Sequence, residues 1–278
     1  MKRILMIIDP QIDFCEGGNL AVPGGQAALD RVADMITRCK NRIDDIVVTF
    51  DSHHPLHIAH PIWFLNSKGN RPTPFTTVKA IDGKICLGQL DGNGVFQQTD
   101  TATTRHPGFH TWTIKYLEQL DASGRYPHML WPPHCLIGHA GAAAVESIAN
   151  AVRAWEEQRF GVAVKVTKGS DIKVEHFGAL RAEVVNPDNL VGTGVNSQFL
   201  GALSDPDTEI YGCGLALSHC LANTARDTSA EFDGDSFVKR FVLLEDGTAN
   251  VQGLEFLGDN FVADFKARGM RVIKTKDF

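Results

Sequence analysis

The stretch Ile4-Leu5-Met6-Ile7-Ile8-Asp9 is an apolar run that ends in an acidic residue. Ile46-Val47-Val48-Thr49-Phe50-Asp51 repeats the pattern, with a short run rich in β-branched residues closed by an aspartate. A strand with one face in water alternates polar and apolar residues, whereas a strand covered on both faces is apolar throughout. Both runs therefore predict buried strands of a parallel sheet.

Segments with helical periodicity separate these runs from others like them. We expect strands near residues 4–8, 46–50, 162–167, 209–211, 241–244 and 271–274, and helices near 25–38, 143–159, 196–203, 220–230 and 254–268. Strands that alternate with helices in this way are typical of α/β proteins. We predict a doubly wound, mostly parallel six-stranded sheet with helices on both faces.

Residues 61–130 depart from this alternation. They are punctuated by Gly, Pro, Thr and Asn and have weak periodicity, with a helical pattern near 112–120. The segment is too long for a plain loop in a compact domain. We predict an enlarged insertion of short strands or hairpins that lies over one edge of the sheet, within a single domain of residues 1–278.

The composition narrows the classes of partner. The chain has 278 residues, a net charge of −6, and no cluster of Lys or Arg. A nucleic-acid-binding protein needs a basic surface, and a membrane span needs about 20 apolar residues in a row. We expect neither partner and no signal peptide, and therefore a cytoplasmic protein. The six cysteines lack paired spacings, so we expect free thiols.

Reactive side chains follow four of the predicted strands. Asp9 follows the first, Asp51 and His53 the second, Lys168 the third, and Cys220 stands near the start of the helix after the fourth. Each alone has an ordinary interpretation as a cap, a turn or a core residue. Because the carboxyl ends of parallel strands meet at one rim, where ligands bind, together they predict a functional site.

Cys220, Asp9 and Lys168 form a chemically coherent group. A thiol attacks as its thiolate, which a helix N-terminus and a nearby Lys168 would favour. Asp9 is placed to take the thiol proton and pass it to a leaving amine. Backbone N–H groups in the turn at 215–220 are candidates for holding an oxyanion. The group predicts acyl transfer through a thioester.

Asp51 and His53 suggest a metal site. The two residues flank Ser52, so on an extended segment both side chains point the same way. A third ligand must come from elsewhere, and the sequence offers His57, His60, His106, His110 and His134. Aspartate and histidine ligands with open positions suit zinc, iron or manganese.

The stretch Trp131-Pro132-Pro133-His134-Cys135 is harder to interpret from its residues alone. The adjacent histidine and cysteine could be a nucleophile beside its base, a pair of metal ligands, or neither. A tryptophan held by two prolines suits stacking on a flat ring.

These motifs, taken in order, resemble the nicotinamidase/pyrazinamidase branch of the isochorismatase-like cysteine hydrolases. The matching segments are DPQIDFCEGGNLAV at 9–22, DSH at 51–53, WPPHC at 131–135 with Gly138 soon after, KG at 168–169, and CGLALSHC at 213–220. They frame most of residues 1–235. The Asp51-x-His53 pair and WPPHC indicate the metal-containing branch.

The resemblance implies a role for each matching residue. It implies Cys220 as nucleophile with Asp9 and Lys168, metal ligands Asp51, His53 and His134, pocket walls Phe14 and Trp131, a cis peptide bond before Ala216, and an oxyanion hole from the N–H groups of Ala216 and Cys220. The implied reaction converts nicotinamide and water to nicotinate and ammonia with one divalent metal ion, zinc before iron or manganese. Cys135 and Cys213 are then structural.

Three departures bear on the substrate. Leu217-Ser218-His219 replaces the usual Thr-Asp-aromatic run before the nucleophile, residues 170–180 match loosely, and the insertion is longer than usual. An amidase for a different small amide is therefore the alternative, and a non-catalytic metal- or ligand-binding module is a more distant one. The substrate would be a small amide, and the insertion leaves a homo-oligomer possible.

Overall fold

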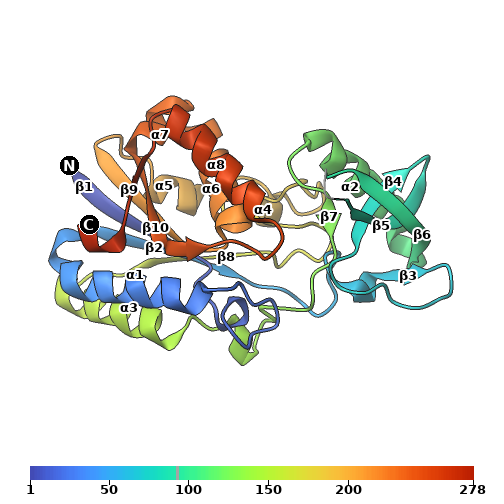
Figure 1. Ribbon diagram of the computed structural model, residues 1–278, viewed down its shortest axis with the longest axis horizontal. Helices are drawn as coiled ribbons and strands as arrows, with labels where there is room; N and C mark the ends of the chain where they lie inside the picture. Colours follow the sequence, from blue (N-terminus) through green and yellow to red (C-terminus); the bar gives the residue numbers. More distant parts are fainter. Residues whose placement is uncertain (92–93) are drawn as a thin grey trace.

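The computed structural model describes residues 1–91 and 94–278, and its larger part is a six-stranded sheet (Figure 1). The strand order is β11-β10-β9-β1-β2-β8, and every pair is parallel. The strands are β1 Lys2–Ile8, β2 Asp45–Asp51, β8 Val164–Lys168, β9 Thr208–Leu215, β10 Phe241–Ala249 and β11 Arg271–Ile273. The predicted α/β class, six strands and parallel pairing are confirmed.

Helices cover both faces of this sheet (Figure 1). One face carries α1 (Gly25–Cys39) and α3 (Glu146–Arg159). The other carries α5 (Ser197–Ala202), α6 (Ala222–Glu231), α7 (Asp235–Arg240) and α8 (Glu255–Ala267). Alternate residues of β1 serve the two cores, with Leu5 and Ile7 packed toward α1 and Ile4 and Met6 toward the opposite layer. This two-sided burial explains the uninterrupted apolar run.

Two predicted helices begin later than their sequence patterns indicate. The helix expected from residue 143 starts at Glu146, because Ala144 pairs with Gln11 and the Val145 N–H donates to Pro10. The helix expected from Cys220 starts at Ala222, after a π-helical turn at Leu217–Leu221 that contains the cysteine. The first helix is shortened by contacts with the loop after β1, and the second by the π-helical turn that follows β9.

The insertion folds around its own antiparallel sheet, with strand order β3-β6-β5-β4-β7. Its elements are β3 Phe64–Asn66, β4 Thr77–Ile81, β5 Lys84–Leu90, β6 Phe96–Thr104, α2 His110–Ser123 and β7 His128–Met129. The apolar side of α2, with Tyr116, Leu117 and Leu120, packs on Val78 and Ile85 of the sheet. The predicted hairpins and the helix near 112–120 are present.

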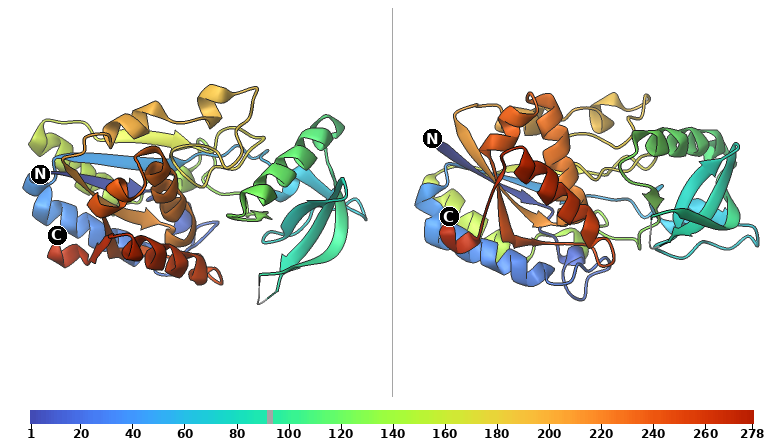
Figure 2. Two further views of the ribbon diagram at one scale, coloured as in Figure 1. Left: turned by 90° about the horizontal axis from the view of Figure 1, so that it is seen from above. Right: turned by 45° about the horizontal axis from the view of Figure 1, so that its top comes forward.

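The insertion lies beyond the carboxyl ends of the parallel strands, and the prediction that it covers one edge of the sheet was wrong (Figures 1 and 2). The reason is topological. The chain enters the insertion after Asp51 ends β2 and returns from it before α3, so the insertion is an expanded strand-to-helix connection. Such connections emerge at the carboxyl end of a parallel sheet, where ligands bind.

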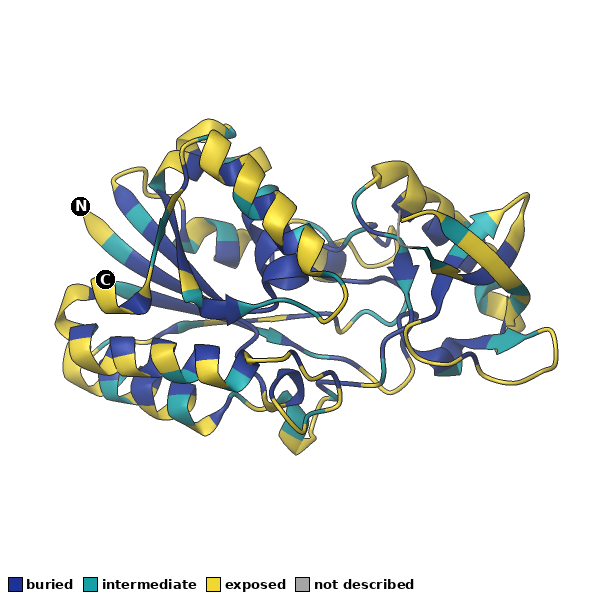
Figure 3. Cartoon of the chain, in the orientation of Figure 1, coloured by how far each residue is buried: buried dark blue, intermediate teal, exposed yellow. Residues whose placement is uncertain are grey.

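The burial of residues matches the layered arrangement of the sheet and its covering helices (Figure 3). The strands of the parallel sheet are mostly buried, whereas the outer faces of α1, α3 and α8 are exposed. Within the described ranges, none of the helices has the length and apolar character needed to cross a membrane.

Candidate active site and metal centre

The ends of β1, β8 and β9 bring Asp9, Lys168 and Cys220 together. The Lys168 ammonium nitrogen lies 2.9 Å from Oδ2 of Asp9 and 3.7 Å from the Cys220 sulfur. The hydroxyl of Thr49, on β2, donates to Oδ1 of Asp9 at 2.5 Å. All of these side chains are buried. The sequence therefore identified three residues that meet in the folded chain.

Burial governs protonation in this group. It raises the pKa of the Cys220 thiol well above the ordinary value, although the Lys168 charge acts in the opposite direction. Burial also raises the pKa of Asp9, against the lowering effect of Lys168 and the Thr49 hydrogen bond. Cys220 lies in the turn before α6 and is shielded from water, so burial opposes the thiolate that the Lys168 charge favours.

Lys168 also joins this group to the second cluster. Its nitrogen lies 3.0 Å from Oδ1 of Asp51 and donates to the His176 carbonyl at 3.1 Å. Burial lowers the pKa of Lys168, the carboxylates of Asp51 and Asp9 raise it, and the net shift is well above the usual value. Lys168 therefore keeps its positive charge between the two carboxylates.

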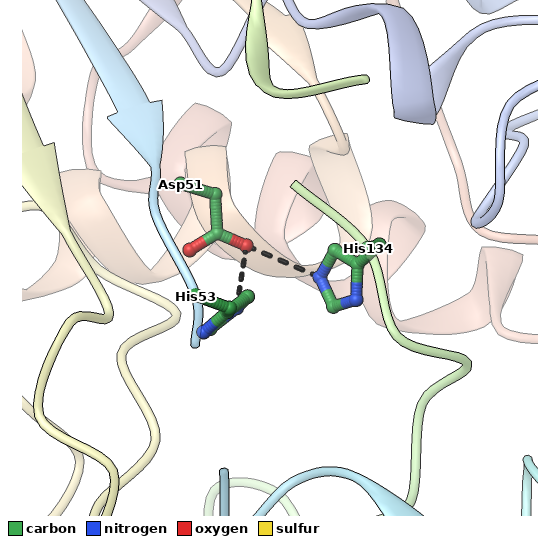
Figure 4. A group of neighbouring side chains, drawn as sticks. All are labelled: Asp51, His53 and His134. Atoms are coloured by element: carbon green, nitrogen blue, oxygen red, sulfur yellow. Dashed lines mark hydrogen bonds and ion pairs between the residues drawn. The ribbon is translucent and has the colours of Figure 1, made fainter. Parts of the chain in front are cut away.

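Asp51, His53 and His134 form the second cluster (Figure 4). Oδ2 of Asp51 lies 2.9 Å from Nε2 of His53 and 3.2 Å from Nε2 of His134, and candidate ligand atoms of the three residues lie within 4.8 Å of one another. The Gln11 side chain holds the end of β2 by accepting from the Asp51 N–H and donating to the Asp51 carbonyl. Of the candidate third ligands, the structure brings His134 into this group.

The hydrogen bonds of the two rings fit a bound metal. Nδ1 of His53 lies 3.0 Å from the Gly169 carbonyl, and Nδ1 of His134 lies 2.9 Å from the Pro132 carbonyl. A carbonyl oxygen only accepts, so each Nδ1 carries a proton and Nε2 is the ring nitrogen left to bind a metal ion. The two Nε2 atoms and the Asp51 carboxylate lie close together, and metal-binding histidines commonly donate their other ring N–H to a carbonyl in this way.

The other candidate histidines lie at different distances from this group. The ring centroids of His57 and His60 are 4.4 and 5.5 Å from that of His53, and Nε2 of each is buried without a hydrogen-bond partner. They border the group of Asp51, His53 and His134 without joining it. His106 and His110 lie in the insertion, at the start of α2 and away from the site.

A compact pocket lies between the two clusters. Phe14 and Trp131 line it as expected, together with Asp51, His134, Ala216 and Cys220. Sequence reasoning missed part of the wall, which consists of Leu20, Val22, Glu175, His176, Phe177, His219 and Val251. Leu20 and Val22 stand in the matched motif after Asp9, but the loosely matching residues 175–177 and distant Val251 gave no signal.

The turn that carries Cys220 begins with the expected cis peptide bond, between Leu215 and Ala216. The Ala216 carbonyl accepts from the N–H groups of His219 and Leu221. Gly214 allows the end of β9 to lie close to the end of β1. Its φ is +103°, and a Cβ there would lie 2.1 Å from the Ile8 carbonyl oxygen. The turn places Ala216 and Cys220 side by side on the pocket wall.

Cys135 has a structural position. Its φ is +46°, and its N–H donates to Oδ2 of Asp13 at 2.6 Å. Its side chain is fully buried, and burial raises the pKa of the thiol far above its usual range. Cys213 is likewise a buried core residue, and all six cysteines, each in the described part of the chain, are free thiols.

Comparison with known proteins supports the resemblance. The chain is 27% identical to the nicotinamidase of Escherichia coli over 141 residues, which are 50% of this chain and 43% of that enzyme. It is 43% identical to the nicotinamidase/pyrazinamidase of Mycobacterium tuberculosis over 51 residues, 18% of this chain and 27% of that enzyme. The matches thus span less than half of either relative. No protein-family model matches the chain.

Solved structures share the fold across nearly the whole chain. Yeast nicotinamidase bound to the inhibitor nicotinaldehyde superposes with a TM-score of 0.62 at 20% identity, covering 98% of this chain and 99% of that one. The pyrazinamidase of Pyrococcus horikoshii in complex with zinc gives 0.55 at 19% identity, covering 99% of each chain. These likenesses show that the chain shares the fold of these enzymes.

Proposed function

We propose that the protein is a metal-dependent amidohydrolase that converts nicotinamide to nicotinate and ammonia through a Cys220 thioester. One observation carries the proposal. Lys168 contacts Asp9, Asp51 and Cys220 at once, so the nucleophile and the metal cluster share one pocket. A heteroaromatic amide held in that pocket presents its carbonyl carbon to the sulfur.

The buried thiol and the raised pKa of Asp9 suit a coupled proton transfer. As the Cys220 sulfur attacks the amide carbon, its proton passes to Asp9, and the carbonyl oxygen gains the negative charge. The N–H groups of Ala216 and Cys220 hold that oxygen. Asp9 then gives its proton to the amide nitrogen, which leaves as ammonia and leaves a thioester on Cys220.

Hydrolysis repeats these roles with water. Asp9 takes a proton from the water that attacks the thioester, and the departing Cys220 sulfur recovers a proton, which restores the thiol and releases the acid. Lys168 stays charged throughout and compensates the carboxylates of Asp9 and Asp51. These steps follow from the chain's own residues.

The Asp51, His53 and His134 side chains would hold the metal ion. Zinc is our first expectation, with iron or manganese as alternatives, since aspartate and histidine ligands admit all three. When bound, the ion supplies a Lewis-acid site for the ring nitrogen of a heteroaromatic amide. Phe14 and Trp131 are placed to hold the flat ring.

A different small amide is the second candidate substrate. His176 and His219 line the pocket, and their imidazole rings add hydrogen-bonding groups to its wall. These residues leave the nucleophile and its partners in place. They therefore bear on which amide is preferred.

An ammonia-release screen over small amides, combined with metal analysis, tests the proposal. We expect release from nicotinamide, and loss of both metal and activity in His53→Ala. The matched control is His106→Ala, a histidine outside the site. Release from another amide but not nicotinamide would favour the second candidate, and full metal content in His53→Ala would refute the ligand set.

A further inference from the structure

One irregular segment, residues 172–184, carries part of the wall of the catalytic pocket. All of its residues are described, and none lies in a helix or strand. Its residues 175–177, which we call the 175–177 wall, line the pocket. On either side of them the segment packs in two different apolar cores. Ile172, Val174, Ala182 and Val184 lie in the core of the insertion, and Ala179 and Leu180 lie in the core on the α6 side of the parallel sheet.

The insertion holds the segment directly before the 175–177 wall. Nε1 of Trp112, on α2, donates to the Lys173 carbonyl oxygen at 2.9 Å. The N–H of Ile58, just before the insertion, donates to the Ile172 carbonyl oxygen at 2.9 Å. Trp112 is half-buried and packs against the insertion core. A side chain of the insertion therefore fixes the backbone that leads into the pocket wall.

The parallel domain holds the segment directly after the wall. The Ala179 N–H donates to the hydroxyl of Thr224, on α6, at 3.0 Å. The Leu180 carbonyl oxygen accepts from the Asn196 N–H at 2.7 Å. The 175–177 wall thus spans two anchors, one on each part of the molecule. Because no helix or strand stiffens the segment, loss of either anchor should let the wall move.

The wall also contacts other residues of the site. The His176 carbonyl oxygen accepts from the Lys168 ammonium group at 3.1 Å. The Phe177 ring centroid lies 5.5 Å from that of His219, another residue of the pocket wall. The candidate metal ligands all lie outside the segment. A displaced wall should therefore change how a substrate ring fits the pocket and leave the metal ligands in place.

We propose that Trp112 is a positioning residue for substrate binding, because its hydrogen bond to Lys173 fixes the 175–177 wall. The insertion then determines how tightly the substrate ring is held. The proposal rests on the proposed function, since it takes the amide ring to occupy the catalytic pocket. Lys168 keeps its contacts with Asp9 and Asp51 whether or not the wall is fixed, so the effect belongs to binding and not to the chemical step.

The substitution Trp112→Phe tests this, because it keeps an aromatic ring on α2 and removes the N–H donor. In the metal-loaded protein we expect KM for nicotinamide to rise about fivefold, as for the loss of one neutral hydrogen bond, and kcat to stay within about twofold. Amide hydrogen exchange of residues 172–178, measured by mass spectrometry, should become faster, and metal content should not change. Trp112→Leu, which also lacks the donor, should shift KM in the same direction.

Two other tryptophans provide matched controls. Trp155→Phe removes an indole hydrogen bond of 3.0 Å to the Ile43 carbonyl oxygen, in the layer of α1 and α3. Trp63→Phe removes one of 3.0 Å to the Thr113 hydroxyl, inside the insertion. Both variants should keep the wild-type KM and the wild-type exchange of residues 172–178, since both retain the Trp112 contact.

Each part of the proposal has a result that overturns it. Unchanged exchange of residues 172–178 in Trp112→Phe would show that the hydrogen bond is no anchor, whatever the substrate. Faster exchange with an unchanged KM would show that the wall does not govern binding. Equal effects in Trp63→Phe would assign them to general loosening of the insertion.

The proposed function is decided separately, by ammonia release from nicotinamide by the wild-type protein. If the wild type releases none, the proposed function fails. The exchange comparison, together with KM for the amide that the protein does hydrolyse, then decides the role of Trp112.

Discussion

Lys168 contacts more of the candidate machinery than any other side chain described above. A single buried ammonium lies between the Asp9 and Asp51 carboxylates and within 3.7 Å of the Cys220 sulfur. Two buried carboxylates this close to one cation are stable because the charges compensate one another. Removing the cation would leave both uncompensated, so the residue has structural and chemical importance together.

Thr49 offers a way to shift the titration of Asp9. Its hydroxyl donates to Oδ1 of Asp9 and lowers the pKa of that carboxyl, so Thr49→Val should raise it. Because Asp9 must be ionised in the free enzyme to accept a proton, the acid limb of the kcat/KM profile should move to higher pH. The same change leaves the Asp9 N–H without its partner and should cost about 1–3 kcal/mol of stability.

The control for this substitution is Thr208→Val. Thr208 is also buried and donates to the Asp205 carbonyl, but it lies at the opposite end of β9. An acid limb that stays in place in Thr49→Val, or that moves equally in both variants, would argue against Asp9 as the base.

A substitution at Gly169 tests whether Asp51 and His53 bind a metal ion, because the Gly169 backbone lies against both side chains. Its φ is +83°, and an added Cβ would lie 2.8 Å from both Oδ1 of Asp51 and Cε1 of His53. We expect Gly169→Ala to weaken metal affinity about 10- to 100-fold, as measured by competition with a chelator. Gly83→Ala is the matched control, since Gly83 has a φ of +69° but open space around it. Equal affinities in the two variants would place the metal elsewhere.

At the residue scale, the sequence identified the groups that follow strands and missed those that line the pocket. Asp9, Asp51 and Lys168 were predictable because a buried parallel strand fixes where its next side chain lies. Glu175 and Val251 reach the pocket through irregular segments, whose paths depend on tertiary contacts. The burial of Cys220, which raises the pKa of its thiol, is a property of the whole fold and could not be predicted from the local sequence.

At the scale of elements, the insertion contacts the turn that carries Cys220. The Tyr126 hydroxyl donates to the Ser218 carbonyl at 2.6 Å and accepts from Arg226 at 3.1 Å. Ser218 and Cys220 lie in the same π-helical turn. The connection between α2 and β7 therefore contacts the Cys220 turn from outside the parallel sheet.

Tyr126→Phe should accordingly lower kcat about tenfold, because loss of this support lets the sulfur and the oxyanion donors drift from their positions. KM should change little if the effect is on positioning. Tyr116→Phe is the control, since that hydroxyl contacts His128 within the insertion. A similar fall in kcat in both variants would indicate general loosening of the insertion.

The two helix starts that differ from prediction have a common cause at this scale. Periodicity reports which residues are buried, but it does not report where the backbone leaves the helix. Residues 143–145 form backbone hydrogen bonds with the loop after β1, and residues 217–221 form a π-helical turn directly after β9. Both segments lie at the carboxyl end of the sheet. Sequence patterns are least reliable where function imposes an irregular backbone.

At the scale of the molecule, a buried ionic cluster joins the insertion to the parallel domain. Arg125 contacts Asp227 on α6 and lies 3.5 Å from Oε2 of Glu183, whose other oxygen is buried without a partner. Burial raises the pKa of the Glu183 carboxyl from its ordinary value of 4.5 to about 7. The folded protein thus holds a proton there that the unfolded chain releases.

This difference predicts a dependence of stability on pH. Between pH 4.5 and about 7, the unfolded chain binds fewer protons at Glu183 than the folded one, so the free energy of unfolding falls as pH rises. Glu183→Gln should remove this component, which amounts to about 3 kcal/mol across the range. Urea unfolding at several pH values would show it. Glu157→Gln, on the exposed side of α3, should keep the wild-type slope.

The fold as a whole was largely predictable, because apolar runs that alternate with helices admit few arrangements. The position of the insertion was predicted wrongly, although it follows from the order of the elements along the chain. An insertion between the end of β2 and α3 belongs to the catalytic rim, and recognising that would have indicated a role in the site.

The most direct measurement is ammonia release from nicotinamide by the metal-loaded protein, by Cys220→Ala and by Cys135→Ala, side by side. The account predicts steady release by the wild type, none above background from Cys220→Ala with its metal content preserved, and substantial release from Cys135→Ala. Release by Cys220→Ala at the wild-type rate, or a wild-type protein that releases none, would contradict it.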